Sequence, residues 1–327
     1  MRSIPWQAEH QFGVFTHAQA REHGWTDSAL RHAARTDVLI RLRKGLYCEP
    51  PDSSLHPREQ AAVLLGRRGV AAALAIPDGT VSHAAALAVH GLPLYGAGDL
   101  PCLTKPQDCR TLQADLHLHR KLLEPRLLDA AAEFSLTSVA RSCIDVACEL
   151  GLRAGVIAAD NALHDGLTTY DDLFRARCSV KGDRGSPVAG RLLDAVDARA
   201  ESPLESLSRV NMAGLVPPPL VQPLIFTVDG VFVGRVDFAW DPPGVVGEAD
   251  GRAKYRMRED ELDQEKSRQD RLTDTNAVMA RWGWRAAQDP NRLADYLQSR
   301  FAVAWQRRAA GIRPNWILRP SDRSRVS

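Results

Sequence analysis

The sequence predicts a multidomain protein of the α+β class. A chain of 327 residues exceeds the length at which a single hydrophobic core stops growing, so two or three domains are expected. The N-terminal order of helix, turn, helix and basic hairpin predicts a winged helix-turn-helix domain. Near the C-terminus, a helix, three strands, a helix and a strand follow one another. The predicted boundaries are 1–52, 53–180 and 181–305, with a basic flexible tail over 306–327.

The composition predicts a soluble globular protein with no membrane partner. Hydrophobic residues make up 44% of the chain and charged residues 25%, and the net charge of +2 indicates no particular partner. The N-terminus lacks the apolar core of a secretory signal, and the six cysteines form no C-x-x-C pair. We therefore expect a cytoplasmic protein with reduced thiols. Without a phosphate-binding glycine loop or a nucleotide fingerprint, no small-molecule cofactor is expected.

Capping signals place the N-terminal helices. Thr16 and Gln19 form a capping box that opens the first helix, and Gly24 ends it. Thr26 or Asp27 caps the second helix. The following "VLIRLRKGLYCEP" is strand-like and contains a glycine turn, which is typical of a wing.

Positive charge is concentrated in this domain. Between Ser28 and Tyr47, five cations accompany one acid, Asp37. Helical spacing places Arg31 and Arg35 on one face of the second helix, and strand alternation places Arg41 and Arg43 on one side of the following strand. The sequence predicts that these cations neutralise DNA phosphates, although a solvated face or a protein-contact module is the alternative. The candidates are Arg31, Arg35, Arg41, Arg43 and Lys44.

The middle region, 53–180, mixes helices with the short strands "PCLTK" and "DLHLHR", and the segment 178–187 is predicted to be a linker. His83 and His90 lie seven apart on one helix, and His117 and His119 share one face of a strand. No carboxylate or cysteine stands at ligand spacing from them along the sequence, so buried, hydrogen-bonded histidines are expected rather than a metal site.

The C-terminal domain contains two opposed carboxylates. Residues 203–214 are predicted to be a helix, followed by strands "LVQPLIF", "VFVGRVDFAW" and "GVVGEAD", a charged helix over roughly 258–282, a strand "WRAAQ" and a helix from about 290. If 241–244 form the hairpin loop, Asp237 lies opposite Glu248, and Asp250 returns to the same face. Like charges that face each other are destabilising, and a hard divalent cation between them would offset the repulsion.

The sequence therefore predicts that Asp237 and Glu248 bind Mg²⁺ or Mn²⁺. The alternative is a solvated outer face of the sheet, with Phe238 and Trp240 on the core side. Glu205 is a candidate helix acid, but as the fourth residue of "SPLE" it is also explained by helix capping. Lys254 is a candidate catalytic cation or a surface lysine. Arg268 and Arg271 are candidate phosphate ligands or part of a charged helix surface.

"SPLESLSR", "GRVDFAW" and "VVGEADG" resemble the PD-(D/E)XK nuclease core, and more narrowly its very-short-patch-repair-endonuclease-like branch. The resemblance implies an α/β restriction-endonuclease-like (αβββαβ) fold. It also implies that Asp237 and Glu248 are metal ligands, that Glu205 assists them, and that Asp250 belongs to the catalytic set. The chain departs from the general motif at Asp250, which stands in the place of the motif lysine.

"GVFTHAQAREHGWTDSALRHAARTDVLIRLRKGLY" is similar to the N-terminal domain of AbiEi-type antitoxins of toxin–antitoxin systems. "VSHAAALAVHGLPL", "LHLHR" and "LTSVARSCIDVA" resemble the domain that follows it. This resemblance implies a DNA-binding regulator whose partners are DNA and a cognate toxin or a second copy of the chain.

Two functions follow from these expectations. One is a Mg²⁺-dependent endodeoxyribonuclease that hydrolyses DNA phosphodiesters in phage defence or a toxin–antitoxin system. The other is a non-catalytic antitoxin or transcriptional regulator with a degenerate nuclease fold.

Overall fold

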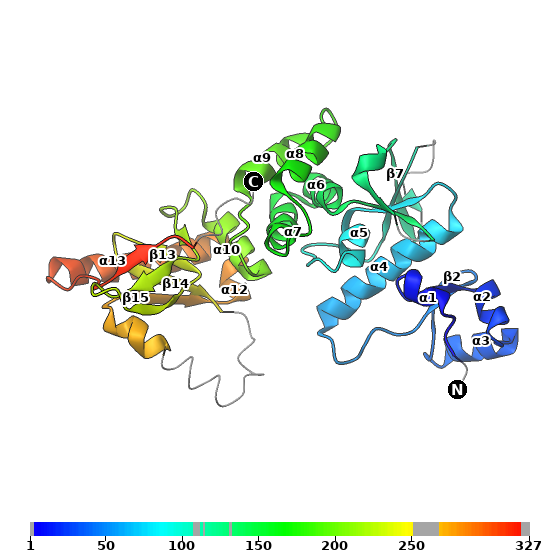
Figure 1. Ribbon diagram of the computed structural model, residues 1–327, viewed down its shortest axis with the longest axis horizontal. Coiled ribbons are helices and arrows are strands. Elements are labelled where there is room, and N and C mark those ends of the chain that lie inside the picture. The colour runs from blue at the N-terminus through cyan, green and yellow to red at the C-terminus, as the bar shows by residue number, and fades with distance from the viewer. Residues whose placement is uncertain (1–2, 107–111, 114, 131–132, 251–267, 322–327) are drawn as a thin grey trace. The chain divides into compact units, whose positions relative to one another are not determined.

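The computed structural model describes residues 3–106, 112–113, 115–130, 133–250 and 268–321. Helices and several sheets alternate along the chain, which confirms the α+β class (Figure 1). Contacts divide the chain into two compact units. Unit 1 comprises Met1–Ala162 and Gly166–Asp194, and unit 2 comprises Leu163–Asp165 and Ala195–Ser327. The predicted range 1–52 lies within unit 1, and so does the range 53–180 except for Leu163–Asp165.

The N-terminal part of unit 1 packs three short helices against a three-stranded sheet of order β1-β3-β2. Phe15, Trp25, Leu30 and Leu39 belong to its buried core. The elements are α1 (Gln7–His10), β1 (Val14–Thr16), α2 (His17–Glu22), α3 (Asp27–Arg35), β2 (Ile40–Arg43) and β3 (Leu46–Cys48).

The helix starts in this part follow the predicted caps. Thr16 Oγ1 accepts a hydrogen bond from the Gln19 backbone N–H, and Gln19 Oε1 accepts one from the Thr16 N–H, which completes the capping box. Thr26, rather than Asp27, caps α3, since its hydroxyl accepts a hydrogen bond from the Ala29 N–H. The turn between β2 and β3 has Gly45 at a φ of 76°, a conformation that glycine adopts without steric cost.

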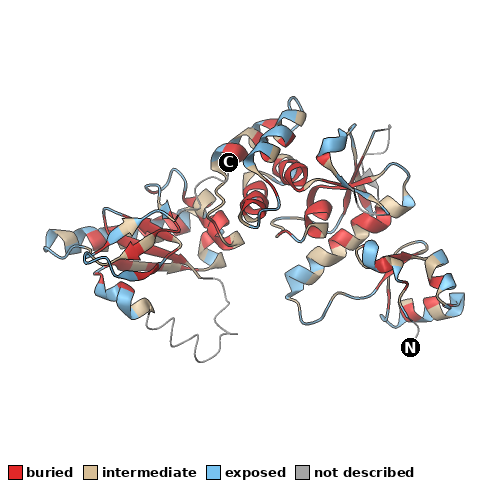
Figure 2. Ribbon diagram, viewed as in Figure 1, coloured by how far each residue is buried: buried red, intermediate tan, exposed pale blue. Residues whose placement is uncertain are grey.

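The rest of unit 1 is built on a six-stranded mixed sheet of order β6-β7-β5-β4-β9-β8. Helices α5 and α6 are buried along most of their length (Figure 2). The strands are β4 (Thr80–Ser82), β5 (Cys102–Lys105), β6 (Leu112–Gln113), β7 (Leu116–Arg120), β8 (Leu128–Ala130) and β9 (Ser135–Thr137). The helices are α4 (Pro57–Ala75), α5 (His83–Val89), η1 (Pro125–Leu127), α6 (Val139–Leu150), α7 (Leu152–His164), α8 (Tyr170–Ser179) and α9 (Ser186–Ala195).

The segment 178–187, predicted to be a linker, connects α8 to α9 and lies wholly within unit 1. Gly185 packs against the backbone of Cys148, because a Cβ there would meet the Cys148 carbonyl oxygen at 2.3 Å. A Cβ on Gly155 of α7 would come within 2.7 Å of the Leu192 side chain of α9. These close contacts hold α9 on unit 1, so the division between the units falls after Asp194.

Unit 2 contains two sheets. One has the order β10-β13-β14-β15 and the other the order β12-β11-β16. Its helices include α10 (Pro203–Met212), α12 (Trp284–Ala287) and α13 (Pro290–Ala309). Residues 268–274, within the predicted charged helix, are also helical. Its strands are β10 (Leu220–Val221), β11 (Leu224–Phe226), β12 (Phe232–Arg235), β13 (Phe238–Trp240), β14 (Val245–Ala249), β15 (Val278–Trp282) and β16 (Ile317–Arg319).

The sheet of β13 and β14 is buried on both faces. On one face, Phe238 stacks on Trp282 with ring centroids 5.7 Å apart, and Trp240 meets Phe301 of α13 edge to face. On the other face, Ala239 and Val246 belong to a core cluster that includes Leu272. Phe238 and Trp240 therefore face a core, as the alternative to a metal site predicts. That alternative also predicts a solvated face on the other side of the sheet, but the face with Ala239 and Val246 is buried too.

The structure corrects several predicted elements of unit 2. The first two predicted strands each divide into two short strands that belong to different sheets, with Gln222 at a φ of 51° between β10 and β11. Residues 278–282 form β15 rather than the end of a helix, and their alternating burial is that of a strand. "WRAAQ", predicted to be a strand, is the short helix α12.

The C-terminal segment is also more ordered than predicted. The sequence predicts a flexible tail from residue 306, yet α13 continues to Ala309 and Ile317–Arg319 form β16, which pairs with β11. Trp316 is buried in the same core cluster as Leu272 and Val246. The physical reason for this order is that the Trp316 indole ring buries a large apolar area against that cluster.

Candidate functional site

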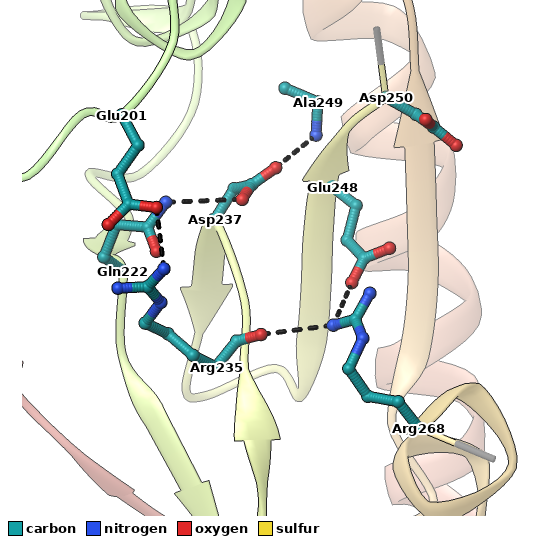
Figure 3. A pocket seen from close by; sticks show the side chains of 8 residues that line it. All are labelled: Glu201, Gln222, Arg235, Asp237, Glu248, Ala249, Asp250 and Arg268. Carbon is teal, nitrogen blue, oxygen red and sulfur yellow. Dashed lines mark hydrogen bonds and ion pairs between the residues drawn. The ribbon is translucent and has the colours of Figure 1, made fainter. Parts of the chain in front are cut away.

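Unit 2 has a cavity of about 260 Å³ at the side of the predicted acid hairpin. Acidic, basic and amide side chains line it together (Figure 3). The lining residues are Glu201, Gln222, Arg235, Asp237, Glu248, Ala249, Asp250 and Arg268.

The hairpin has the predicted register. Trp240 pairs with Val245, Ala239 with Val246, and Phe238 with Gly247. Continuing this register places Asp237 opposite Glu248. Asp237 lies between β12 and β13 rather than inside a regular strand, and its Oδ2 accepts a hydrogen bond of 2.8 Å from the Ala249 backbone N–H (Figure 3).

Asp237 and Glu205 share one amide group. Gln222 Nε2 donates to Glu205 Oε2 at 2.8 Å and to Asp237 Oδ1 at 3.3 Å. Burial raises the pKa of Asp237 to about 7, and the charges of Glu205 and, to a smaller extent, Glu248 add to this rise. Asp237 and Glu248, the acid pair that the sequence predicts, therefore repel each other, and the carboxylate of Glu205 adds to the repulsion on Asp237.

Glu248 is held by two arginines. Its Oε1 lies 2.8 Å from Nη1 of Arg268, and its Oε2 lies 3.1 Å from Nη2 of Arg281. Arg281 reaches it because β14 and β15 pair in parallel with Glu248 opposite Arg281. Arg268 lies one helical turn before Leu272, and Leu272 packs on the face of the sheet that carries Ala239 and Val246. Positive charge therefore stands beside Glu248, supplied by guanidinium groups.

The donor chemistry of the cavity suits a hard divalent ion, because Asp237 and Glu248 offer carboxylate oxygens. Within the described ranges, however, no three carboxylates of this cavity bring their oxygen atoms close enough together to be a ready ion cage. Both oxygens of Glu248 are also in ion pairs. An ion bound by Asp237 and Glu248 would compete with Arg268 or Arg281 for a Glu248 oxygen.

Glu205 is buried and lies behind the cavity wall. Its Oε1 accepts a hydrogen bond of 2.7 Å from the Ser202 hydroxyl, and its Oε2 accepts one of 3.0 Å from the Glu201 N–H. Ser202 also caps α10. The capping role that the sequence predicts for "SPLE" is thus present, and Glu205 acts on the cavity through Gln222.

The other predicted residues of this domain separate into three groups. Asp250 and Arg268 line the cavity. Arg271 is exposed and directs its Nε toward the Val233 carbonyl oxygen at 3.5 Å, away from the lining residues. Lys254 lies outside the described residues.

The predicted DNA-binding residues are mostly at the surface of unit 1. Arg31 and Arg35 on α3, Arg41 on β2 and Lys44 in the turn are all exposed. Arg43 differs, because its Nη2 pairs with Asp115 at 3.2 Å and its side chain is only 20% exposed. A β-bulge between Arg41 and Arg43 separates the two arginines that simple alternation places on one side. Within the described part of the chain, Arg43 is therefore engaged by an acid, unlike the other four predicted cations.

Sequence reasoning missed several lining or neighbouring residues of the cavity. Arg281 has no local signal, because only the parallel pairing of β14 and β15 brings it to Glu248. Gln222 is an ordinary polar residue in the sequence, and Glu201 pairs with Arg235 at 2.7 Å across the cavity wall. Arg281 could be found from the sequence only once 278–282 is recognised as a strand beside β14.

Residues 4–50 match the family model of the transcriptional regulator AbiEi antitoxins. This match confirms the predicted resemblance for the N-terminal part of the chain. No curated protein matches the chain. Among the described residues, no helix combines the length and the apolar character that crossing a membrane requires.

Proposed function

We propose that the protein is a DNA-binding transcriptional regulator of the AbiEi antitoxin type, with residues 1–52 acting as a winged helix-turn-helix. The observation that supports this proposal best is the family match over residues 4–50, which covers α1, α2, α3 and the β2–β3 hairpin. A toxin–antitoxin system is the biological context, and a cognate toxin or a second copy of the chain is the protein partner that we expect.

The exposed cations agree with this function. Arg31, Arg35, Arg41 and Lys44 are exposed, and the structure gives none of them an ion pair within the ranges that it describes. Cations that are not engaged by acids are available to DNA phosphates, and phosphate contacts dominate affinity. In the proposed complex α3 enters the major groove, and the β2–β3 turn contacts the backbone.

The experiment is duplex binding by fluorescence anisotropy over a range of salt concentrations. Arg31→Ala combined with Arg35→Ala is expected to weaken binding and to lower the salt slope by roughly two, since each lost phosphate contact removes about 0.9. Arg126→Ala with Arg153→Ala removes the same charge from exposed positions outside α3 and is expected to leave the slope unchanged. An equal effect of both pairs would contradict a specific role of α3.

A second function is proposed for unit 2: metal-dependent hydrolysis of DNA phosphodiesters, as in phage defence. The burial of Asp237 and its crowding by Glu205 and Glu248 favour this function, because both raise the pKa of a carboxylate that a bound cation would stabilise. Asp237 and Glu248 would hold Mg²⁺ or Mn²⁺, and such an ion, when bound, polarises a phosphate oxygen and activates water. Arg235 and Arg268 on the cavity wall offer donors to a phosphodiester.

Cleavage of supercoiled plasmid, short duplex and RNA with Mg²⁺ or Mn²⁺ tests this second function. Asp237→Asn and Glu248→Gln are expected to lower cleavage by at least a hundredfold, whereas Asp229→Asn, at an exposed turn, is expected to retain it. If the wild-type protein cleaves none of these substrates, the nuclease function is rejected and only the regulator function remains.

A further inference from the structure

Unit 1 contains a second cluster of reactive side chains, far along the sequence from the acid hairpin. His83, Cys102, His119 and Glu149 each present one nitrogen, sulfur or oxygen donor atom, and these atoms all lie within 4.8 Å of one another. No cysteine or carboxylate stands at ligand spacing from these histidines along the sequence, yet the fold places Cys102 and Glu149 beside them.

The sheet brings these residues together from four separate elements. Antiparallel pairing places Ser82 of β4 opposite Cys102 of β5, and His83 follows Ser82 directly as the first residue of α5. Parallel pairing of β5 with β7 places Cys102 next to His117 and Thr104 next to His119. Glu149, near the end of α6, directs its carboxylate to Cys102, with Oε2 at 3.8 Å from Sγ.

Two features of the histidines suit coordination. Nε2 of His119 is buried and has no hydrogen-bond partner in the described part of the chain. An unsatisfied buried polar atom is destabilising, and a metal ion would satisfy it. Nδ1 of His83 lies 2.9 Å from Ser82 Oγ; when it donates its hydrogen there, the lone pair of Nε2 is left for an ion.

His83 also has an uncommon backbone. Its φ is 55°, in the left-handed region that residues other than glycine seldom adopt. This conformation lets the chain turn from β4 into α5 at the cluster.

The donor atoms are close to the spacing of a four-coordinate ion. Bonds of 2.0–2.3 Å in a tetrahedron place ligand atoms roughly 3.3–3.6 Å apart. Glu149 Oε1 lies 3.9 Å from His119 Nε2 and 4.0 Å from Cys102 Sγ, and all four donor atoms lie within 4.8 Å of one another, so the set must contract on binding. The rings of His83 and His119 are stacked, with centroids 3.8 Å apart, and they must splay so that both lone pairs meet at one point.

We propose that His83, Cys102, His119 and Glu149 bind one divalent transition-metal ion of the zinc class. Two imidazoles, a thiolate and a carboxylate form a mixed nitrogen, sulfur and oxygen set, which selects such ions over Mg²⁺ or Ca²⁺. A dication with one thiolate and one carboxylate has no net charge, which suits a site where His83 and Cys102 are buried and Glu149 reaches the surface. Binding releases the thiol proton of Cys102 to solvent. His117, with Nδ1 at 3.2 Å from Glu149 Oε1, orients the carboxylate from outside the ligand set.

The test uses full-length, metal-free protein titrated with Co²⁺ and then with Zn²⁺. One Co²⁺ per chain is expected, with a sulfur-to-cobalt charge-transfer band and the visible spectrum of a tetrahedral site, and Zn²⁺ is expected to displace it. Cys102→Ser should abolish the charge-transfer band. His119→Ala should weaken binding by at least tenfold, as measured by calorimetry on variants whose circular dichroism matches that of the wild type.

Two matched variants make the result specific. Cys178→Ser removes an exposed thiol of the same unit and should leave the band intact. Asp237→Asn alters the proposed all-oxygen site of unit 2 and should likewise leave the band intact, so the failure of one site is distinguishable from the failure of the other. The absence of stoichiometric binding by the wild type, or a charge-transfer band that survives Cys102→Ser, would overturn the proposal and leave a hydrogen-bonded histidine cluster.

Discussion

At the scale of one residue, Asp237 is a buried carboxylate whose hydrogen bonds do not fully compensate for the loss of solvent. It keeps two hydrogen bonds, from the Ala249 N–H and the Gln222 amide, yet burial and the neighbouring acids raise its pKa to about 7. The alternation of "RVDFAW" and the length of its loop suffice to predict that Glu248 faces it. The contributions of Gln222 and Glu205 depend on chain segments that no local pattern relates to the hairpin.

The raised pKa of Asp237 predicts a pH dependence of stability. In the unfolded chain the aspartate has its ordinary pKa of about 3.8, so between that value and about 7 the folded state binds more protons. The stabilisation is complete below the unfolded pKa and is lost as the pH rises through about 7. Wild-type protein is therefore expected to lose up to about 4 kcal/mol of unfolding free energy between pH 4 and pH 8 relative to Asp237→Asn.

Urea unfolding followed by tryptophan fluorescence at several pH values measures this difference, because Trp240, Trp282 and Trp316 are buried in unit 2. Parallel pH profiles of the wild type and Asp237→Asn would show that Asp237 titrates normally.

The contact between Arg268 and Glu248 leads us to expect competition between this arginine and a metal ion at the hairpin. Its guanidinium group lies 2.8 Å from Glu248 Oε1, so an ion that binds this carboxylate competes with it. Arg268→Gln is expected to tighten Mn²⁺ binding at the hairpin by about tenfold, since loss of one charge-assisted hydrogen bond is worth about 1.5 kcal/mol or more. Calorimetric titration measures it, with Arg271→Gln as the matched control. Weaker Mn²⁺ binding in Arg268→Gln would instead show that Arg268 supports the site.

At the scale of elements, the β13–β14 hairpin is positioned by aromatic packing on one face. Gly247 lies where Phe238, Trp240 and Trp282 converge, and no side chain fits there. Period-2 alternation predicts which face is apolar. The sequence does not predict the break between β10 and β11, because Gln222 has a φ of 51°, a conformation that residues other than glycine seldom adopt.

Gly247→Ala tests this packing. The added Cβ would lie 2.8 Å from Trp282 and 2.9 Å from Trp240, so the rings must shift, and a loss of about 1–3 kcal/mol of unfolding free energy is expected. Gly234→Ala is the control, because its Cβ would meet Arg268 at an ordinary 3.5 Å. Thermal unfolding of both variants measures the contrast, and equal stability of the two would show that the aromatic cluster yields freely.

At the scale of the whole molecule, each unit completes its structure with segments distant in sequence. In unit 2, β16 pairs with β11 and Trp316 enters the core beside Leu272. In unit 1, α9 returns to pack on α7. A basic, proline-containing composition predicts a mobile tail, and composition alone misses the single buried indole that anchors it.

Truncation at the C-terminus provides the corresponding prediction. A chain that ends after Ile312 lacks Trp316 and β16, and unit 2 is expected to lose about 3 kcal/mol or more of unfolding free energy. A chain that ends after Ser321 keeps both and should unfold as the full chain does. Urea unfolding compares the two, and equal stability would mean that the segment 313–321 contributes nothing to the core.

The sequence by itself determined the α+β class, the capped helices α2 and α3, the exposed cations of α3, and the opposition of Asp237 and Glu248. All of these depend on local periodicity, capping or a short loop, which neighbouring residues specify. Only the tertiary structure decided that Arg268 and Arg281 hold Glu248, that Arg43 pairs with Asp115, and that Cys102 and Glu149 join two histidines. Those contacts arise from strand pairing and helix packing across long stretches of chain, where residue spacing along the sequence has no bearing on distance in space.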